Sequence, residues 1–493
     1  MNFDRFEMLS KSYNIVPVFR EITADLLTPV LAFSKIRGNA EFPFLLESVE
    51  SIGRLARYSF IGKDPYKIIF GHGKQSFVTT AGKTEKSDLD IFEQMKLEIG
   101  NFNYPKLDDL PNFTGGYVGY IGYENISLVE DVLEFTGQDE LGIPDSIMAL
   151  YRDLIVFDHY KHKILIISNI FVDEHESADL AYNFGLEKIA SIRNKLVDNP
   201  GQIGTFKTGG FTEPAESDRD NFFKAVEKAK QHIYEGDIFQ IVLSKRFSTE
   251  YSGDLLNVYR ALRMINPSPY MYYLDFGKEI SIIGTSPEDL LSVQKSKAAI
   301  LPIAGTRRRG KTEEEDQFLE DELLNDPKEI AEHVMLVDLA RNDLGRICDY
   351  NSISLVEDKK IHKFSHVMHI VSRVEGALDE KYDVIDALKA CFPAGTVSGA
   401  PKIKAMQLIN KYENLKRNVY AGSIGYIDFR GNMDMCIAIR TLYAKNNKIF
   451  WQAGAGIVAD SQPHLELKEI FNKSAVLVKS LKFAGEIDED RNN

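Results

Sequence analysis

The stretch Asn325–Arg346 reads NDPKEIAEHVMLVDLARNDLGR and predicts a helix with acidic side chains on one face. Asn325 or Asp326 can cap this helix, because short polar side chains accept hydrogen bonds from the first free N–H groups. Pro327 suits the first turn, where a missing N–H costs no hydrogen bond. We therefore expect the helix to begin at this proline.

The two faces of this helix differ in chemistry. Ile330, Val334 and Val337 recur at helical spacing and are expected to face a core. Glu329 and Glu332 are three residues apart on a neighbouring stripe, close enough to share a hard cation such as magnesium. The helix alone favours a simpler interpretation, in which the two acids are solvated and complement the helix dipole. Support for a metal has to come from other parts of the chain.

Length and composition limit the possible classes of protein. At 493 residues the chain is too long for one ordinary core, so we expect two domains or one large interleaved architecture. With 44% hydrophobic and 27% charged residues it has the composition of a soluble globular protein. The net charge of -14 disfavours binding to nucleic acid or to an anionic membrane, so we expect neither as a partner.

The three cysteines, Cys348, Cys391 and Cys436, have no paired spacing and predict neither a disulfide framework nor a zinc site. The N-terminal ten residues have no apolar core of a leader, and no run approaches the roughly 18 apolar residues of a membrane span. We therefore expect a cytoplasmic protein.

The order of patterns along the chain predicts an α+β protein with large sheets. Residues 153–158 and 163–170 are apolar runs around a short polar turn, which is typical of a hairpin. Helical periodicity follows over 178–197, and the Gly-, Pro- and acid-rich stretch 198–220 then breaks every pattern. Strands and helices alternate in the second half, which ends in a helix over about 465–481.

Two strand ends carry functional side chains. In Gly284–Glu288 (GTSPE), Glu288 is placed either as a general acid at the strand end or as an acid in the first turn of a helix. In Pro302–Gly310 (PIAGTRRRG), the basic run Arg307–Arg309 can meet an anionic substrate, although a solvated charged loop is the simpler interpretation.

Three further stretches in the second half are dense in glycine or histidine. The alternation in Lys363–Glu375 predicts a strand with His369 on the face opposite His366. Phe392–Lys402 is a glycine-rich turn into a helix without the spacing of a nucleotide P-loop. Gln452–Gly456 (QAGAG) is expected to follow a strand and to offer N–H groups to a carboxylate.

Taken in this order, these stretches resemble the chorismate-utilising enzymes, and among them component I of the anthranilate synthases. The resemblance covers nearly the whole chain. It implies an α+β fold in which large mixed or antiparallel sheets form a β-sandwich core covered by helices. It also implies an N-terminal domain over 1–198 with a tryptophan-binding motif, a linker over 199–219 and a chorismate-binding catalytic domain over 220–493.

The resemblance implies chorismate as substrate and magnesium as cofactor, with Glu332 and Glu469 as the metal ligands. It implies catalytic roles for Glu288 as the acid that protonates the departing hydroxyl, for His369 in pyruvate loss and for Thr396 in the pocket wall. The implied substrate-binding residues are Gly305, Thr306, Tyr420, Arg440, Gly454, Ala455 and Gly456.

Two positions separate the relatives within this family. Isochorismate-forming members carry a lysine where this chain has Gln240, and aminodeoxychorismate synthases carry one where it has Ala304. The resemblance therefore implies attack by ammonia at C2 of chorismate, followed by loss of pyruvate to give anthranilate. An aminodeoxychorismate synthase and a non-catalytic tryptophan-sensing subunit are the alternatives. Three departures from the family pattern, at Arg308, Gln462 and His464, concern loop conformation more than the metal ligands.

The resemblance also implies feedback inhibition by tryptophan, bound by Glu47, Ser48, Pro269, Tyr270 and Met271. No cysteine lies in a Gly-x-Cys-x-Gly turn, so use of glutamine would need a separate glutamine amidotransferase subunit, component II, as partner.

Overall fold

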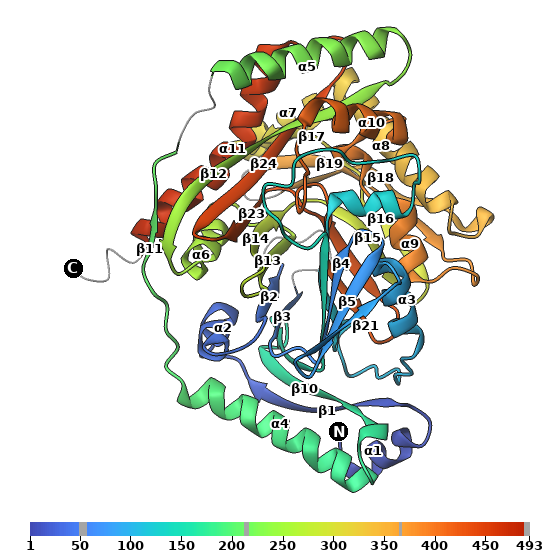
Figure 1. Cartoon of the computed structure of the whole chain (residues 1–493), viewed down its shortest axis with the longest axis vertical. Helices are drawn as coiled ribbons and strands as arrows, with labels where there is room; N and C mark the ends of the chain where they lie inside the picture. The colour runs from blue at the N-terminus through green and yellow to red at the C-terminus, as the bar shows by residue number, and fades with distance from the viewer. Residues whose placement is uncertain (49–56, 212–215, 364–366, 488–493) are drawn as a thin grey trace.

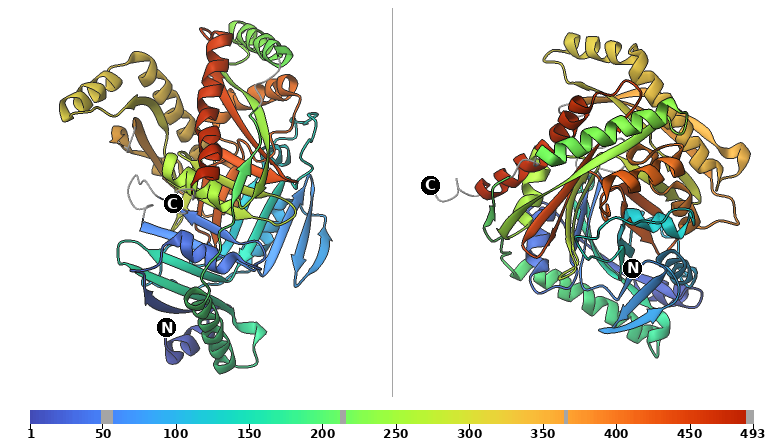
Figure 2. Two further views of the ribbon diagram at one scale, coloured as in Figure 1. Left: turned by 90° about the vertical axis from the view of Figure 1, so that its left-hand side faces the viewer. Right: turned by 45° about the horizontal axis from the view of Figure 1, so that its top comes forward.

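The computed structural model describes residues 1–48, 57–211, 216–363 and 367–487. His366, expected opposite His369, lies outside these residues. The described chain builds two twelve-stranded sheets, and every pairing between their strands is antiparallel (Figures 1 and 2). The predicted class of large antiparallel sheets with helices is confirmed.

In the first sheet the strands follow one another in space in the order β1 (Ile15–Thr23), β10 (Lys163–Phe171), β9 (Asp153–Asp158), β3 (Tyr58–Gly62), β2 (Phe44–Glu47), β13 (Tyr270–Asp275), β14 (Ser281–Ser286), β23 (Thr441–Lys445), β24 (Lys448–Ile457), β12 (Gln240–Gly253) and β11 (Phe206–Thr208), and β20 (Gly399–Ala400) pairs with β12. The order in the second sheet is β17 (Ile303–Arg308), β19 (Val367–Ala377), β16 (Lys297–Ile300), β15 (Asp289–Gln294), β22 (Met433–Ile437), β21 (Ser423–Asp428), β7 (Gly116–Ile121), β8 (Ser146–Tyr151), β4 (Lys67–His72), β5 (Gln75–Thr80) and β6 (Lys83–Ser87), and β18 (Ser354–Lys363) pairs with β19.

Both sheets combine strands from the two halves of the chain. In the first sheet β2 pairs with β13, and in the second β7 pairs with β21. On its other side β7 pairs with β8, where the close approach requires glycine, since a Cβ on Gly119 would lie 1.9 Å from the Ile147 carbonyl oxygen. Inner faces of the two sheets meet in one apolar cluster, which includes Phe44 and Ile282 from the first sheet and Val118 from the second. This cluster is the core of the sandwich.

The helices cover the outer faces and the ends of the sheets (Figures 1 and 2). They are α1 (Phe3–Ser10), α2 (Pro29–Arg37), α3 (Ile91–Gly100), α4 (Ala178–Asp198), α5 (Glu216–Tyr234), α6 (Leu256–Ile265), α7 (Glu313–Leu324), α8 (Pro327–Gly345), α9 (Val384–Cys391), α10 (Lys402–Glu413) and α11 (Pro463–Glu486). The hairpin expected over 153–170 and the helix expected over 178–197 are present as β9–β10 and α4.

Helix α8 begins as expected from its sequence. The Asp326 side chain accepts hydrogen bonds from the N–H groups of Lys328 and Glu329, and Pro327 is the first helical residue. The expected core face was wrong at Val334, which is 43% exposed. The buried face of α8 instead runs through His333, Leu336, Val337, Ala340 and Leu344. It rests on β19, where the His333 ring bonds the Ser372 hydroxyl at 2.7 Å.

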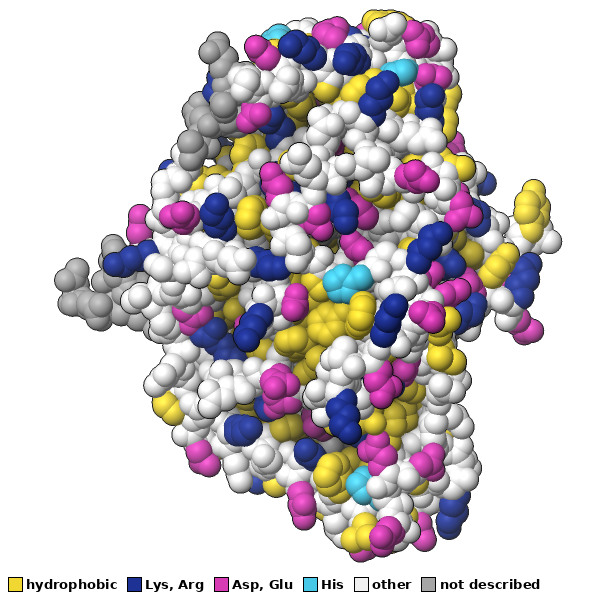
Figure 3. All heavy atoms as spheres, in the orientation of Figure 1, with side chains coloured by type: hydrophobic (Ala, Val, Ile, Leu, Met, Phe, Trp, Pro, Cys, Tyr) yellow, Lys and Arg dark blue, Asp and Glu magenta, His cyan; other side chains and the backbone are white. Residues whose placement is uncertain are grey.

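Acidic and basic side chains are interspersed over the face of the molecule shown in Figure 3. Among the described residues, no helix combines the length and the apolar character that crossing a membrane requires.

Candidate active site

Glu288 lies in the short connection between β14 and β15, and the surrounding backbone fixes its position. The Ser286 hydroxyl donates to the Ile437 carbonyl at 2.7 Å, and the Ile437 N–H donates back to the Glu288 carbonyl at 3.1 Å. Burial raises the pKa of the Glu288 carboxyl to about 7, against the opposing effects of Thr396, Lys473 and Arg440. A carboxyl with this pKa is protonated in a substantial fraction of molecules near neutral pH and is therefore suited to general acid catalysis.

Thr396 and Arg440 come to Glu288 from two other elements. Thr396 lies in the 3-10 turn η5 (Gly395–Val397), and its buried hydroxyl interacts with the Glu288 carboxyl without a hydrogen bond of normal geometry. Arg440 follows β22, and its carbonyl accepts the Thr285 N–H at 3.3 Å. Burial lowers the pKa of Arg440, and the charge of Glu288 partly offsets this. The guanidinium remains a cation in this pocket and can hold an anionic substrate.

The residues Gly305, Thr306 and His369 form one contact group on β17 and β19. The Thr306 hydroxyl and the Gly305 carbonyl each lie 3.0 Å from His369 Nδ1. Because a carbonyl only accepts, Nδ1 carries the proton of the neutral ring and Nε2 has the lone pair. Burial lowers the pKa of His369, and Arg440 lowers it further. Since the charge of Arg440 acts on both His369 and Glu288, the two candidate catalytic groups lie near the same guanidinium.

The backbone conformation at position 305 requires glycine. The pairing of β17 with β19 shifts register between Ala304 and Thr306, and Gly305 has φ +63°. A Cβ here would lie 2.9 Å from a Leu323 methyl. The bulge turns the Gly305 carbonyl toward His369 and so fixes the imidazole tautomer.

The glycine-rich stretch 452–456 is part of strand β24, so the expectation that it follows the strand was wrong. Gly454 and Gly456 lie opposite Ser244 and Val242 of β12, whose N–H groups point away from β24 to Glu413 and to the Ser398 carbonyl. In an antiparallel pair, the opposed residues then also direct their N–H groups outward. The two glycines therefore present N–H groups at the outer edge of β24, while Ala455 between them faces β12.

These glycines also make room for two side chains of the site. A Cβ on Gly454 would lie 2.6 Å from the Tyr420 hydroxyl, and a Cβ on Gly456 would lie 2.7 Å from the Gln240 amide. Tyr420 is buried, and its hydroxyl lies against the backbone of β24 at Gly454. Glycine is needed at these two positions of the strand because neighbouring side chains fill the space that a Cβ would occupy.

Glu332 on α8 lies close enough to Glu469 on α11 for the charge of Glu469 to act on it. Partial burial raises the pKa of Glu332, and the charges of Glu329 and Glu469 raise it further. The Glu469 charge thus acts on Glu332 from a separate helix, and carboxylate oxygens are the donors that a hard divalent cation prefers. Glu329 is already engaged, since it pairs with Arg307 at 3.2 Å. The residues present thus fit a magnesium ion held by Glu332 and Glu469.

Lys473 connects this pair to the rest of the pocket and was missed in the sequence. Its ammonium group donates to the Gly454 carbonyl at 3.0 Å, pairs with Glu469 at 2.8 Å and lowers the pKa of Glu288. The signal was present, because Lys473 lies four residues after Glu469 and so on the same face of a helix.

Comparison with known proteins gives the family of this chain. Residues 46–479 match the model of a family described as chorismate binding enzyme. This chain belongs to the chorismate binding enzyme family. It is 42% identical over 492 residues to anthranilate synthase component 1 of Acetivibrio thermocellus, with 98% of this chain and 99% of the relative covered. The Aquifex aeolicus protein of the same name is 41% identical, with 99% of each chain covered.

Solved structures agree with the family. The crystal structure of anthranilate synthase component I from Streptococcus pneumoniae TIGR4 matches with a TM-score of 0.74 and 38% identity, covering 92% of this chain and 99% of that one. The isochorismate synthase MenF of Escherichia coli matches with a TM-score of 0.71 at 19% identity, which shows a shared fold.

The basic run of this chorismate binding enzyme is paired with acids of its own helices. Arg307 contacts Asp326, the N-cap of α8, and Glu329 within that helix. On α7, Glu315 pairs with Arg308 and Asp316 pairs with Arg309. Of the two interpretations of this run, the solvated charged segment agrees with these contacts.

The stretches named for tryptophan come together at a second place in the chorismate binding enzyme. Glu47 of β2 lies opposite Met271 of β13, and Ser48 follows directly. The Glu47 carboxylate accepts hydrogen bonds from Ser59 and Tyr259. The buried Ser48 hydroxyl has no hydrogen-bond partner among the described residues, as expected of a group that meets a ligand.

Pro269 and Tyr270 lead into the same strand, and the Tyr270 hydroxyl donates to Asp434 at 2.9 Å. Tyr270 also lies opposite Ser286 of β14, two residues before Glu288. The two groups of residues are therefore neighbours across one strand pair.

Proposed function

We propose that this chain is the large subunit of an anthranilate synthase, which converts chorismate and ammonia to anthranilate and pyruvate. The observation that carries the proposal is the Glu288 carboxyl, whose pKa burial raises to about 7 beside Arg440 and Thr396. Gln240 and Ala304 support it, because neither side chain offers an amine to activate water or to attack the ring. The full-length relatives named anthranilate synthase component 1 support the same choice.

Binding of chorismate would use both ends of the pocket. Arg440, Thr306 and the N–H groups at the outer edge of β24 would hold one carboxylate in a fixed orientation. Tyr420, whose hydroxyl lies against Gly454, would close the side of the pocket. Glu332 and Glu469 would hold magnesium, which when bound neutralises the second carboxylate and cancels its repulsion from the nearby glutamates.

The reaction then needs one acid and one base. As the nitrogen of ammonia forms a bond to C2, the ring double bonds shift and the C4–O bond breaks, and Glu288 donates the proton with which the hydroxyl leaves as water. The His369 Nε2 lone pair then accepts the proton lost from C2 as the C3–O bond breaks. The ring becomes aromatic, and the leaving group departs as the enolate of pyruvate, which takes up a proton, while the nitrogen that attacked as ammonia gives one up. Amination followed by elimination gives anthranilate.

A partner would supply the ammonia. The chain has no glutaminase nucleophile elbow, so we propose a glutamine amidotransferase as the second component and cytoplasmic assembly of the two. The isolated chain would then use ammonium but not glutamine.

Tryptophan would bind where β2 ends and β13 begins and act as feedback inhibitor, which would place the enzyme at the first committed step of tryptophan biosynthesis. Glu47 and the Ser48 hydroxyl would meet the amino acid, together with the backbone of Pro269, Tyr270 and Met271 beside them. Because Tyr270 pairs with Ser286, a shift of Tyr270 on inhibitor binding would move the connection that carries Glu288.

The test is the purified chain with chorismate, magnesium and either ammonium or glutamine, followed by the fluorescence of the product. We expect a fluorescent aromatic amine with ammonium, none with glutamine, and suppression by tryptophan. Chorismate consumption without this product would refute the proposal. Turnover of glutamine by the isolated chain would refute the requirement for a partner.

A further inference from the structure

Arg417 is a fully buried cation directly behind the candidate active site. It lies in the connection between α10 and β21, and its side chain is 1% exposed. Its guanidinium donates to the carbonyls of Val397 at 2.7 Å and Val242 at 2.8 Å. It also makes a two-pronged ion pair with Glu413, at 2.8 Å from Nε and 2.6 Å from Nη2. The rigid guanidinium fork can reach all these acceptors at once.

The two carbonyl acceptors belong to segments next to candidate site residues. Val397 directly follows Thr396 in η5, and Val242 lies opposite Gly456 on the strand pair β12–β24. The guanidinium carbon also lies 5.4 Å from the ring centroid of Tyr420, within the range of a cation–π contact. One side chain thus ties together three elements that would touch chorismate.

The ion-pair partner extends the same arrangement. Glu413 Oε1 also accepts the N–H of Ser244 at 2.8 Å and its hydroxyl at 2.7 Å. Ser244 in turn accepts a hydrogen bond from the Gln452 amide, so the pair connects α10 to both β12 and β24.

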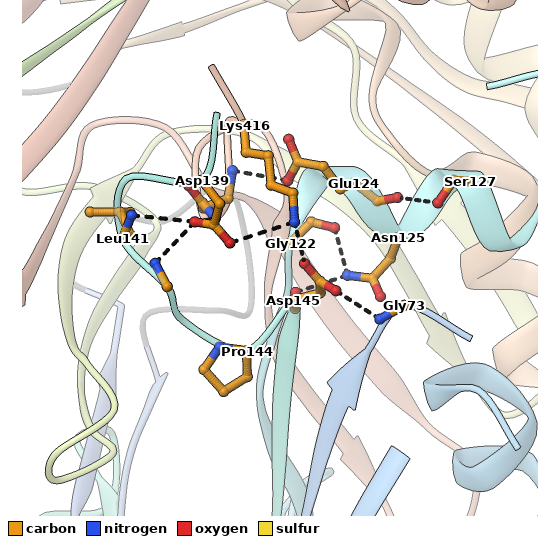
Figure 4. A network of polar contacts seen from close by, with 12 residues as sticks. Gly73, Gly122, Glu124, Asn125, Ser127, Asp139, Leu141, Pro144, Asp145 and Lys416 are labelled. Atoms are coloured by element: carbon orange, nitrogen blue, oxygen red, sulfur yellow. Dashed lines mark hydrogen bonds and ion pairs between the residues drawn. The ribbon is translucent and has the colours of Figure 1, made fainter. Parts of the chain in front are cut away.

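The N-terminal half of the chain holds Arg417 in place from the other side. The two oxygens of the Glu124 carboxylate accept the N–H groups of Arg417 at 2.6 Å and Asn418 at 3.0 Å. The preceding Lys416 lies between Asp139 and Asp145, at 3.5 Å and 3.7 Å (Figure 4). Three carboxylates of the first half therefore hold a three-residue segment of the second half, whose central side chain reaches the pocket.

We propose that Arg417 is a positioning residue for chorismate, held by Glu124, which sets the η5 turn and the Tyr420 ring against the outer edge of β24. The inference rests on the proposed function for its assay but requires only that this pocket binds chorismate. Arg417 does not touch the substrate, and its effect passes through the Val397 carbonyl and the Tyr420 ring.

The decisive variant is Arg417→Lys. Lysine keeps the charge beside Glu413 but has a single ammonium group and cannot also reach both carbonyls. We expect the KM for chorismate to rise and kcat to fall, with a loss in kcat/KM of about 10- to 100-fold, the scale of a pocket wall displaced by about 1 Å. The KM for ammonium should not change.

A merely structural role gives a different result. Loss of folded molecules lowers the apparent kcat and leaves the KM for chorismate unchanged. Ile189→Ala serves as a control, because Ile189 lies in the buried face of α4, far along the chain from the candidate active site. We expect it to lower the melting temperature and to leave the KM for chorismate unchanged.

A second variant keeps the proposal testable if Arg417→Lys fails to fold. In Glu124→Gln, one carboxylate oxygen becomes an NH₂ group that faces a backbone N–H, so the segment must shift. The KM for chorismate should rise in the same direction but less. An unchanged KM in each folded variant would overturn the proposal.

The dissociation constant of chorismate, measured by calorimetry without ammonium, separates this inference from the proposed function. If the wild-type chain makes no anthranilate, the proposed function fails. A larger dissociation constant for chorismate in Arg417→Lys than in the wild-type chain still supports the positioning role, and an unchanged constant overturns it.

Discussion

Replacing Glu288 by glutamine tests the chemistry at its centre. Glutamine has nearly the shape of the protonated carboxyl and can keep the interaction with Thr396, but it cannot donate a proton to a leaving hydroxyl. Binding of chorismate should therefore survive, and the loss should appear in kcat.

The magnitude follows from the role. A positioned general acid contributes typically 10²- to 10⁴-fold to a rate. At about 1.4 kcal/mol for each tenfold, Glu288→Gln should raise the barrier by about 3–5 kcal/mol. We expect kcat to fall about 100- to 10,000-fold, with a KM for chorismate within about threefold of the wild-type value, since the change removes an interaction made in the transition state.

The pH dependence gives a second signature. The acid form of Glu288 is the active one, so kcat/KM at constant free ammonia should decline as pH rises through about 7. In the complex, the two carboxylates of chorismate add like charge and should move the decline in kcat to higher pH. The residual rate of Glu288→Gln should lack this decline.

The same variant has an internal control for folding. Burial raises the pKa of Glu288 from its ordinary value of 4.5 to about 7, so the folded state disfavours ionisation and the wild-type protein loses stability as pH rises between these values. Glu288→Gln lacks this carboxyl, so its melting temperature should fall less over that range. A folded Glu288→Gln protein with wild-type kcat would refute the assignment of Glu288 as the acid.

Three further changes test other parts of the account. Gly305→Ala should cost about 1–2 kcal/mol of stability, because an L residue at φ +63° is strained and the Cβ meets Leu323; unchanged urea unfolding would contradict this. Glu47→Gln should weaken inhibition by tryptophan about tenfold or more with kcat unchanged, because a charge-assisted hydrogen bond contributes about 1.5–3 kcal/mol; wild-type inhibition would remove Glu47 from the site. Glu332→Gln should raise the magnesium concentration for half-maximal rate, while Glu329→Gln, whose carboxylate already pairs with Arg307, should change it little; equal effects would contradict the choice of ligand.

Local sequence rules predicted the elements better than their faces. The start of α8 was predictable because Asp326 and Pro327 act within one turn, independently of the rest of the fold. The exposure of Val334 was not predictable, because only the packing of α8 on β19 decides which stripe of the helix is covered. The bulge at Gly305 likewise depends on the register of two strands that are far apart in sequence.

The glycines of β24 show a different limit. Local sequence rules treat glycine as a strand breaker, but β24 continues through Gly454 and Gly456 by pairing with β12, and Tyr420 and Gln240 fill the space where side chains would be. Such a requirement comes from other segments and cannot be read from the stretch itself. Lys473, by contrast, lay within reach of a spacing rule and was overlooked.

The central claim is that this chain alone aminates chorismate and expels pyruvate. The most direct measurement uses the purified protein with chorismate, magnesium and ¹⁵N-labelled ammonium, with both products identified by mass spectrometry. We expect anthranilate with the label in its amino group and an equal amount of pyruvate. A labelled product that retains the enolpyruvyl group, or an unlabelled hydroxylated product, would contradict it.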